Sequence, residues 1–137
     1  MSRDVSLGAV YNQTGAGLTA AYNFGAVFMP SRGQVLNLFP QATGDPGVPG
    51  VTSTTVKLQG RYSSTSPWDD VQTKNINTGA SAVEQTFGTF PGAGATLGYG
   101  PLMFDPRGYP GGMRVGVKVV GVPAAADNVL VNAAVSL

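Results

Sequence analysis

The clearest pattern of hydrophobic and polar positions runs from residue 52 to residue 73, TSTTVKLQGRYSSTSPWDDVQT. Its first half alternates with a period of two, which is typical of a strand with one buried and one solvated face. The hydroxyl residues and the proline at 63–67 predict a turn. Trp68 then begins a return strand, so the segment predicts a β-hairpin in which the Trp68 ring closes one end of a sandwich core. The predicted inward residues are Val56, Leu58, Gly60 and Tyr62, and the predicted outward residues are Thr55, Lys57, Gln59 and Arg61.

Two long strands are predicted near the end of the chain. Residues 113–122, MRVGVKVVGV, and residues 128–137, NVLVNAAVSL, alternate in the same way. Leu130 and Ala134 make the second face of the last strand apolar too, which favours cover on both of its sides. The predicted inward residues are Met113, Val115, Val117, Val119, Val129, Val131, Ala133 and Val135, whereas Arg114 and Lys118 face water.

Weaker patterns predict the remaining strands, which cover residues 2–11, 18–29, 34–39 and 82–90. Residues 71–76 continue the return strand of the hairpin, and Pro40 ends the strand that precedes it. Seven or eight short strands joined by Gly- and Pro-rich turns are typical of an antiparallel β-sandwich or jelly roll. At 137 residues the chain fits one domain. We therefore expect an all-β fold with a single sandwich domain over residues 1–137.

Two segments lack periodicity and are predicted to be loops. Residues 41–50, QATGDPGVPG, and residues 91–112, PGAGATLGYGPLMFDPRGYPGG, are rich in Gly and Pro. A loop as long as the second is uncommon in a compact domain and is usually functional or disordered. Its large side chains, among them Leu102, Phe104 and Tyr109, argue against a disordered linker. We expect an ordered loop that lies against its own domain or against a neighbouring subunit.

The amino-acid composition and the net charge exclude several classes of function. Charged residues make up 11% of the chain, against roughly 25% in an average soluble domain. Either the surface is polar without charge, or other subunits cover much of it, and we favour the second interpretation. The net charge of +1 and the scattered basic residues give no electrostatic reason to expect a nucleic-acid partner. The absence of Cys and His excludes disulfides, thiol nucleophiles, zinc sites of the usual type and histidine catalysis.

The start of the chain and its apolar stretches bear on localisation. The first residues, MSRDVSLG, contain no basic segment followed by an apolar run. No stretch approaches the roughly 18 apolar residues that span a bilayer. We therefore expect synthesis in a cytoplasm, without a signal peptide and without a membrane partner.

Candidate chemistry among the charged residues is sparse. Asp69 and Asp70 are adjacent, but neighbours on a strand point to opposite faces, so they do not converge as acid–base catalysis requires. One of them could join loop carbonyls and Asp45 or Asp105 in a calcium site, although a solvated turn is the favoured interpretation. Asp105 and Arg107 could form an ion pair that pins the long loop, or Arg107 could reach an acidic patch on a partner.

Aromatic residues offer one further candidate, a platform for sugars formed by Tyr62, Trp68, Tyr99 and Tyr109. The favoured interpretation instead places Tyr62 and Trp68 in the core, because both sit where the alternation predicts burial. The glycines of residues 92–100, GAGATLGYG, lack the following helix with Lys and Ser or Thr that a phosphate loop requires. No catalytic constellation, cofactor motif or metal site is predicted, and we expect that the chain is not an enzyme.

Residues 56–73 combine a strand of the form V-x-L-Q-G, a Ser- and Thr-rich turn, and a Trp followed by an acidic residue. Residues 112–137, GMRVGVKVVGVPAAADNVLVNAAVSL, contain an alternating strand and an apolar final one. In both segments the chain resembles small β-sandwich virion proteins of tailed bacteriophages, which are often head decoration, or capsid cement, proteins. The resemblance implies a trimer on the outside of an icosahedral capsid that clamps neighbouring major capsid subunits. It assigns no role to any single residue.

The main hypothesis is therefore a structural virion subunit that binds the capsid exterior and stabilises junctions between capsomers. Its contacts are expected in the N-terminal segment and in residues 40–51 and 91–112. Leu102, Met103, Phe104 and Tyr109 are the expected anchors, because buried apolar and aromatic groups carry most interface energy. The alternative is a glycan-binding or adhesion sandwich of a virion or tail, which exposure of Trp68 or Tyr99 would favour. The predicted contact residues are Arg3, Asp4, Leu102, Met103, Phe104, Arg107 and Tyr109.

Overall fold

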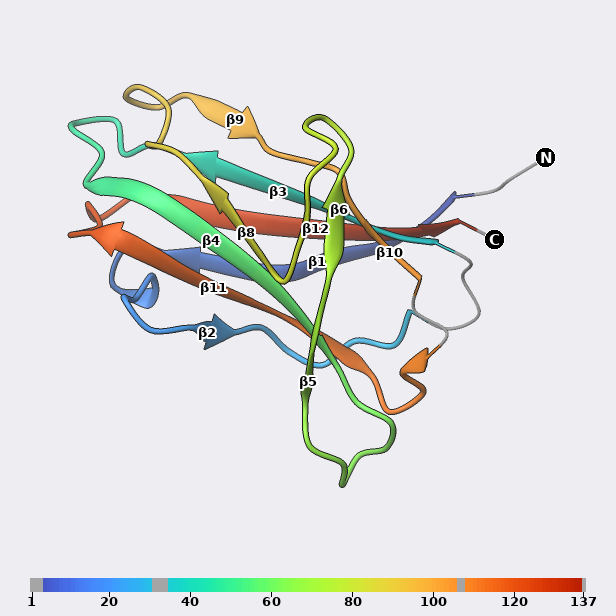
Figure 1. The fold of residues 1–137 in the computed structure, drawn as a ribbon. Helices are drawn as coiled ribbons and strands as arrows, with labels where there is room; N and C mark the ends of the chain where they lie inside the picture. The colour runs from blue at the N-terminus through green and yellow to red at the C-terminus, as the bar shows by residue number, and fades with distance from the viewer. Residues whose placement is uncertain (1–3, 31–34, 106–107, 137) are drawn as a thin grey trace.

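The computed structural model describes residues 4–30, 35–105 and 108–136, which form two antiparallel β-sheets packed against each other (Figure 1). Sheet A has seven strands and sheet B has five. Sheet A contains, in spatial order, β1 (Asp4–Thr14), β12 (Asn128–Ser136), β3 (Val35–Thr43), β10 (Leu102–Phe104), β6 (Thr73–Asn75) and β7 (Ser81–Ala82), with β9 (Thr96–Gly98) also on β3. Sheet B contains β2 (Asn23–Phe24), β11 (Met113–Gly121), β4 (Val51–Gly60) and β5 (Asp69–Val71), with β8 (Glu84–Phe87) also on β4. The predicted all-β antiparallel sandwich is confirmed, with twelve strands among the described residues in place of the seven or eight predicted.

The core lies between the sheets and is built mainly from β3, β4, β11 and β12. Every second residue of β11 and β12 is buried over most of each strand, and Val115 and Val131 are both 0% exposed. The inward faces predicted for residues 113–122 and 128–137 are therefore confirmed. Burying an aliphatic side chain of this size contributes about 1.5–3 kcal/mol, so these strands supply much of the driving force for folding.

The predicted central hairpin is present, but its aromatic residues lie elsewhere than predicted. β4 pairs with β5, with Leu58 opposite Val71. β4 ends at Gly60, after which Arg61 N–H donates to the carbonyl of Gly112. The alternation therefore stops before Tyr62, whose side chain is 74% exposed, so its predicted burial is wrong. Trp68 is only partly buried and packs against arginines on the outer side of sheet B, so its predicted place in the core is wrong too.

Trp68 was predicted to close one end of the sandwich core. Two aromatic residues from the predicted long loop, Phe104 and Tyr109, take this place instead. The rings of Phe104 and Tyr109 lie 5.8 Å apart between centroids and pack against the core. Tyr109 lies directly over Gly60, where an added Cβ would stand 2.4 Å from its ring. Only glycine permits this close approach, so the V-x-L-Q-G pattern ends on Gly60 for a packing reason.

Between β5 and β8 the chain crosses from sheet B to sheet A and back (Figure 1). β5 belongs to sheet B, and β6 begins two residues later in sheet A; β7 lies in sheet A and β8 in sheet B. The single strand predicted over 82–90 is therefore wrong at its start. Gln85 fixes this crossing, because its buried side-chain amide donates to the carbonyls of Thr73 and Ala80 at 3.0 and 3.2 Å.

Within the segment predicted as a long loop, the described residues 91–105 include β9 and β10, which both pair with β3 of their own domain. Pro40 does not end β3 as predicted, because the strand continues to Thr43. Pro40 has no N–H to donate, and it lies opposite the break between β9 and β10, where Tyr99 N–H donates to its carbonyl at 2.8 Å. The missing donor therefore costs no bond of the ladder.

The N-terminal third departs from its predicted pattern for local reasons. The register of β1 against β12 shifts between Ser6 and Gly8 and again between Ala9 and Tyr11. Val10 and Tyr11 are therefore both buried although they are adjacent in sequence. The strand predicted over 18–29 shrinks to β2 and a single bridge between Phe28 and Met113.

Candidate functional site

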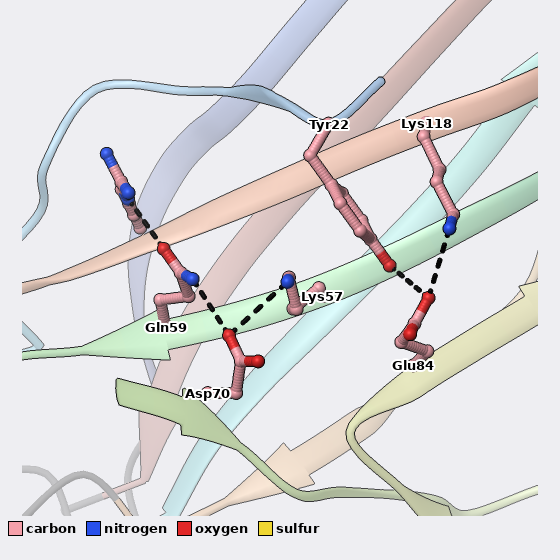
Figure 2. A network of polar contacts seen from close by, with 7 residues as sticks. Tyr22, Lys57, Gln59, Asp70, Glu84 and Lys118 are labelled. Carbon is pink, nitrogen blue, oxygen red and sulfur yellow. Dashed lines mark hydrogen bonds and ion pairs between the residues drawn. The ribbon is translucent and has the colours of Figure 1, made fainter. Parts of the chain in front are cut away.

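Charged and aromatic side chains from four strands and from the segment before β2 lie together on the outer face of sheet B (Figure 2). Lys57 comes from β4, Lys118 from β11, Asp70 from β5 and Glu84 from β8, and Tyr22 precedes β2. Outward positions on adjacent strands lie side by side, so residues far apart in sequence meet here. We call this surface the charged face.

The first network on the charged face runs through Asp70. Lys57 Nζ lies 3.3 Å from Asp70 Oδ1, and Gln59 Nε2 donates to the same oxygen at 2.8 Å. Gln59 Oε1 in turn accepts a hydrogen bond from Arg114 Nε at 2.9 Å. The hydrogen bond from Gln59 is the main cause that lowers the pKa of Asp70, with Lys57 adding to it against burial. One amide side chain therefore orients a carboxylate on one side and a guanidinium on the other.

The second network centres on Glu84. The hydroxyl of Tyr22 donates to Glu84 Oε2, and Lys118 Nζ lies 3.4 Å from the same oxygen (Figure 2). Lys57 Nζ and Lys118 Nζ also lie 4.2 and 4.8 Å from the centroid of the Tyr22 ring. Burial, followed by the hydrogen bond to Glu84, raises the pKa of Tyr22 well above its ordinary value. Each lysine of this face therefore contacts both a carboxylate and an aromatic ring.

A third cluster stacks arginines on rings. The guanidinium carbon of Arg114 lies 3.9 Å from the Phe24 centroid and 4.4 Å from the Trp68 centroid, and that of Arg61 lies 4.4 Å from the Trp68 centroid. Gly116 leaves room for Phe24, because a Cβ there would stand 2.5 Å from the ring. Burial and the nearby charge of Arg61 lower the pKa of Arg114. Phe24, Arg61, Trp68 and Arg114 are called the arginine–aromatic cluster below.

Replacing Arg114 by Ala is expected to lower the free energy of unfolding by about 1–2 kcal/mol, because two ring contacts and the Gln59 hydrogen bond are lost. Urea unfolding followed by circular dichroism measures this loss. Lys74→Ala, which removes an exposed lysine of β6, is the control and should change stability by less than about 0.5 kcal/mol. An Arg114→Ala variant as stable as the wild type would show that the cluster contributes no stability.

The outer face of sheet A has the opposite character, and we call it the uncharged face. Along β12, β3, β9 and β10, the outward residues of the strands include no charged side chain. Among the described residues, Asp4 and Lys74 lie at the margins of this face, and the exposed Asp105 directly follows β10. Asn132 lies near its middle, between Ala9 and Phe39 on the neighbouring strands, and Phe39 is 42% exposed. The outward residues of the central strands are Leu130, Asn132 and Ala134 of β12, Asn37, Phe39 and Gln41 of β3, and Met103 of β10.

One end of the sandwich presents the valine tip, formed by Val48, Val120 and Val122, which are 84%, 62% and 85% exposed. Val48 lies in the loop between β3 and β4, and Val122 follows β11. The two loops touch, since a Cβ on Gly50 would stand 1.7 Å from the carbonyl oxygen of Val122.

A buried carboxylate holds the loops of the valine tip together. Asp127 is 0% exposed, and its oxygens accept the backbone N–H groups of Asp45, Gly50, Val51 and Ala124. Asp45 is pinned in return, because Oδ2 accepts the N–H of Ala126 at 2.8 Å and Oδ1 that of Gly47 at 2.7 Å. Nothing in the sequence pattern singled out Asp127, which reads there as part of a turn.

The predicted contact residues do not form one surface. Asp4 is exposed at the margin of the uncharged face, where it accepts a hydrogen bond from the Ser136 hydroxyl at 2.8 Å, and Met103 lies on that face. Leu102 is a core residue with 1% exposure, so its expected role as a partner contact is wrong. Phe104 and Tyr109 are partly buried against the core. Arg3 and Arg107, and with Arg107 the proposed ion pair to Asp105, lie outside the described residues.

The four aromatic residues of the predicted sugar platform are also separated. Tyr62 is exposed, Trp68 belongs to the arginine–aromatic cluster, and Tyr109 covers Gly60. Tyr99 stacks on Phe87 with centroids 4.5 Å apart, and its hydroxyl is buried. A platform made of all four is therefore wrong, although Tyr62 and Trp68 stay close to the surface beside Arg61.

The described residues show no converging ligands for a metal. No group of three or more Asp or Glu side chains within them could hold an ion. Asp70 is engaged by Lys57 and Gln59, and both oxygens of Asp45 accept backbone N–H groups, so these residues do not support the calcium alternative. Within the same described residues, no helix has the length and apolarity needed to cross a membrane.

Comparison with known proteins relates the fold to one of phage origin. No family model matches the sequence, and no curated protein matches it. The SPBc2 prophage-derived protein YomS is similar in structure, with a TM-score of 0.58 and 14% identity over 100% of this chain and 96% of YomS. The VP2 subviral particle and the Gx strain structure of infectious bursal disease virus both give TM-scores of 0.40, at 10% and 8% identity, and this chain spans only 32% of each of those chains. The likeness to YomS shows that this chain shares its fold with a prophage-derived protein.

Proposed function

We propose that this chain is a non-enzymatic structural subunit of a phage virion, which decorates the outside of an icosahedral capsid and stabilises the junctions between capsomers. The observation that carries the proposal is the separation of charge between the two outer faces. The charged face carries two ion pairs and the arginine–aromatic cluster, whereas the central strands of the uncharged face present amides, hydroxyls and apolar groups. The fold shared with prophage-derived YomS supports a phage setting.

The uncharged face suits a protein partner for a physical reason. Removing a charge from water is costly unless it is paired, and the cores of protein interfaces are depleted of charged residues. Phe39, Leu130 and Met103 can be covered by a neighbouring subunit without leaving a charge unpaired. The low charge content of 11% follows from a surface of which one face is covered in the assembly.

The valine tip provides a second contact, to which the segment 40–51 contributes Val48. Exposed apolar side chains gain most when a partner covers them, and the hydrogen bonds to Asp127 fix their loops before binding. A ligand that binds the assembled shell alone stabilises it by mass action, and a trimer multiplies the effect through avidity. Asp4 and Met103 lie at the edge and on the uncharged face, and they remain proposed contacts.

Matched lysine substitutions on the two faces test this function. Asn132→Lys places a charge near the middle of the uncharged face, and Thr86→Lys places one on β8 of the charged face. Co-sedimentation with empty capsids of the phage that encodes the chain measures binding, and light scattering measures the mass of the free protein. Asn132→Lys is expected to weaken capsid binding at least about tenfold, because the lysine would be buried unpaired, whereas Thr86→Lys leaves it unchanged.

The two measurements separate the parts of the proposal. A wild-type trimer that co-sediments with capsids and depends on Asn132 supports the decoration role. A wild-type monomer that does not bind capsids contradicts it. Capsid binding that is lost in Thr86→Lys and retained in Asn132→Lys would contradict the assignment of the uncharged face.

A further inference from the structure

The basic residues of the charged face fall into two groups. Lys57 and Lys118 each lie within 3.4 Å of a carboxylate oxygen, from Asp70 and Glu84 respectively. Arg61 and Arg114 form no ion pair with any carboxylate among the described residues. Two cations stack on one Trp ring, and after burial the nearby charge of Arg61 is the second cause that lowers the pKa of Arg114.

Both guanidinium groups are held in place from one side. Arg114 Nε donates to Gln59 at 2.9 Å, and Arg61 Nε donates to the carbonyl of Gly111 at 2.9 Å. Arg61 Nη1 makes a long contact of 3.4 Å with the Ser64 carbonyl. The terminal nitrogens of Arg114 and Nη2 of Arg61 make no hydrogen bond within the described residues. A planar guanidinium fixed in this way presents its remaining donors as a fork that matches a carboxylate.

The groups beside Arg61 suit a sugar more than a peptide. Tyr62, the next residue, is 74% exposed, and a flat exposed ring can stack on the apolar face of a sugar. The turn at 63–66 consists of Ser and Thr, and Ser63 Oγ lies 2.8 Å from Ser66 Oγ. Hydroxyl groups act as both donors and acceptors, as sugar hydroxyls require of their partners.

We propose that Arg61 and Arg114, stacked on Trp68, form a binding site for the carboxylate of an acidic saccharide, with Tyr62 and the 63–66 turn contacting the sugar ring. The site lies at the end of β4, on the face opposite to the one assigned to the capsid. A subunit attached through the uncharged face would leave it open to solvent. The site does not depend on the decoration role, since either assignment can fail alone.

Fluorescence of Trp68, which is the only Trp, reports directly on this site. The wild-type protein is titrated with trigalacturonate, with its methyl ester as the neutral matched sugar, and with triglutamate as an acidic peptide. Trigalacturonate is expected to bind at least about tenfold more tightly than the other two ligands. Arg61→Gln and Arg114→Gln should each lose about tenfold in affinity, whereas Lys118→Gln, whose lysine already has a carboxylate partner, stays within about twofold of the wild type.

The variants and the three ligands distinguish an acidic-saccharide site from a site for a protein partner and from the absence of a specific site. Arg61→Gln leaves the Phe24 and Gln59 contacts of Arg114 in place, so it tests the site even where Arg114→Gln loses stability. Equal affinity for the acid and its methyl ester would overturn the proposal, and so would a Trp68 signal that does not saturate below about 10 mM. Triglutamate binding as tightly as trigalacturonate would assign the arginines to a protein partner instead. Selective binding of the acid that is lost in Arg61→Gln supports the saccharide site.

Discussion

Asp127→Asn is expected to lower the free energy of unfolding by about 3 kcal/mol at pH 7, which is among the largest effects of any single substitution in this chain. The Asp127 carboxylate is 0% exposed and accepts backbone N–H groups from Asp45, Gly50 and Ala124 at 2.9 Å and from Val51 at 3.3 Å. An amide at this position has one acceptor oxygen and brings an NH₂ group against the donors. Buried N–H groups would then lack partners, and the valine tip would lose its anchor.

The dependence of this effect on pH identifies the carboxylate as its cause. Burial acts to raise the pKa of Asp127, but the N–H donors outweigh it and hold the pKa below its ordinary value. The stability that the ionised group supplies is therefore complete above the unfolded pKa of about 3.9 and is lost as the pH falls through the lower folded pKa. Urea unfolding at pH 7, 4 and 3 should show the wild type approaching the variant in acid.

The control for this experiment is Asp69→Asn, which neutralises an exposed carboxylate of β5. It should leave stability within about 0.5 kcal/mol of the wild type at pH 7. A difference between Asp127→Asn and the wild type that stays constant from pH 7 to pH 3 would mean that shape, and not charge, is responsible. No difference at pH 7 would contradict the anchoring role altogether.

The strands that could be predicted are those in which hydrophobic residues at every second position mark one buried face. In β11 and β12, every second residue from Met113 to Val119 and from Val129 to Val135 is hydrophobic and is buried as predicted. The hairpin of β4 and β5 was predictable because the Ser- and Thr-rich turn interrupts two such runs. In these elements the local pattern and the tertiary environment agree.

The errors arose where the environment changes within a regular pattern. The alternation of β4 continues to Tyr62, but the strand ends at Gly60 because the Arg61 N–H bonds to Gly112, a residue 51 positions later in the chain. Pro40 is tolerated inside β3 because the neighbouring strand is broken opposite it. Local periodicity cannot predict that Arg61 bonds to Gly112 or that the strand beside Pro40 is interrupted, because it contains no information on the register between distant strands.

The candidate surfaces were predictable only in part for the same reason. The outward positions of Arg61 and Arg114 followed from alternation, but their meeting around Trp68 depends on the pairing of β4 with β11 and β5. The low charge content raised the expectation of a covered surface. The proposal that this surface lies on sheet A required the strand order, which the sequence left open.

Leu102→Ala is the second substitution with a large expected effect on stability. Its neighbour Met103 lies on the proposed interface, so the two residues of β10 distinguish effects on stability from effects on capsid binding. Leu102 is 1% exposed and pairs with Leu38 and Asn75 in the middle of sheet A. Truncating a buried Leu costs about 2–5 kcal/mol through lost burial and the cavity left behind. Met103 points to the uncharged face, so Met103→Ala should change stability by less than about 1 kcal/mol.

Capsid binding should respond in the opposite order. At a temperature at which both variants are folded, Leu102→Ala is expected to bind capsids like the wild type, because its side chain does not reach the surface. Met103→Ala should bind several-fold more weakly, because a proposed contact of the uncharged face is removed. Thermal unfolding and co-sedimentation of the same samples measure both properties. A folded Leu102→Ala protein with wild-type stability and no capsid binding would place Leu102 at an interface and contradict the core assigned to β10.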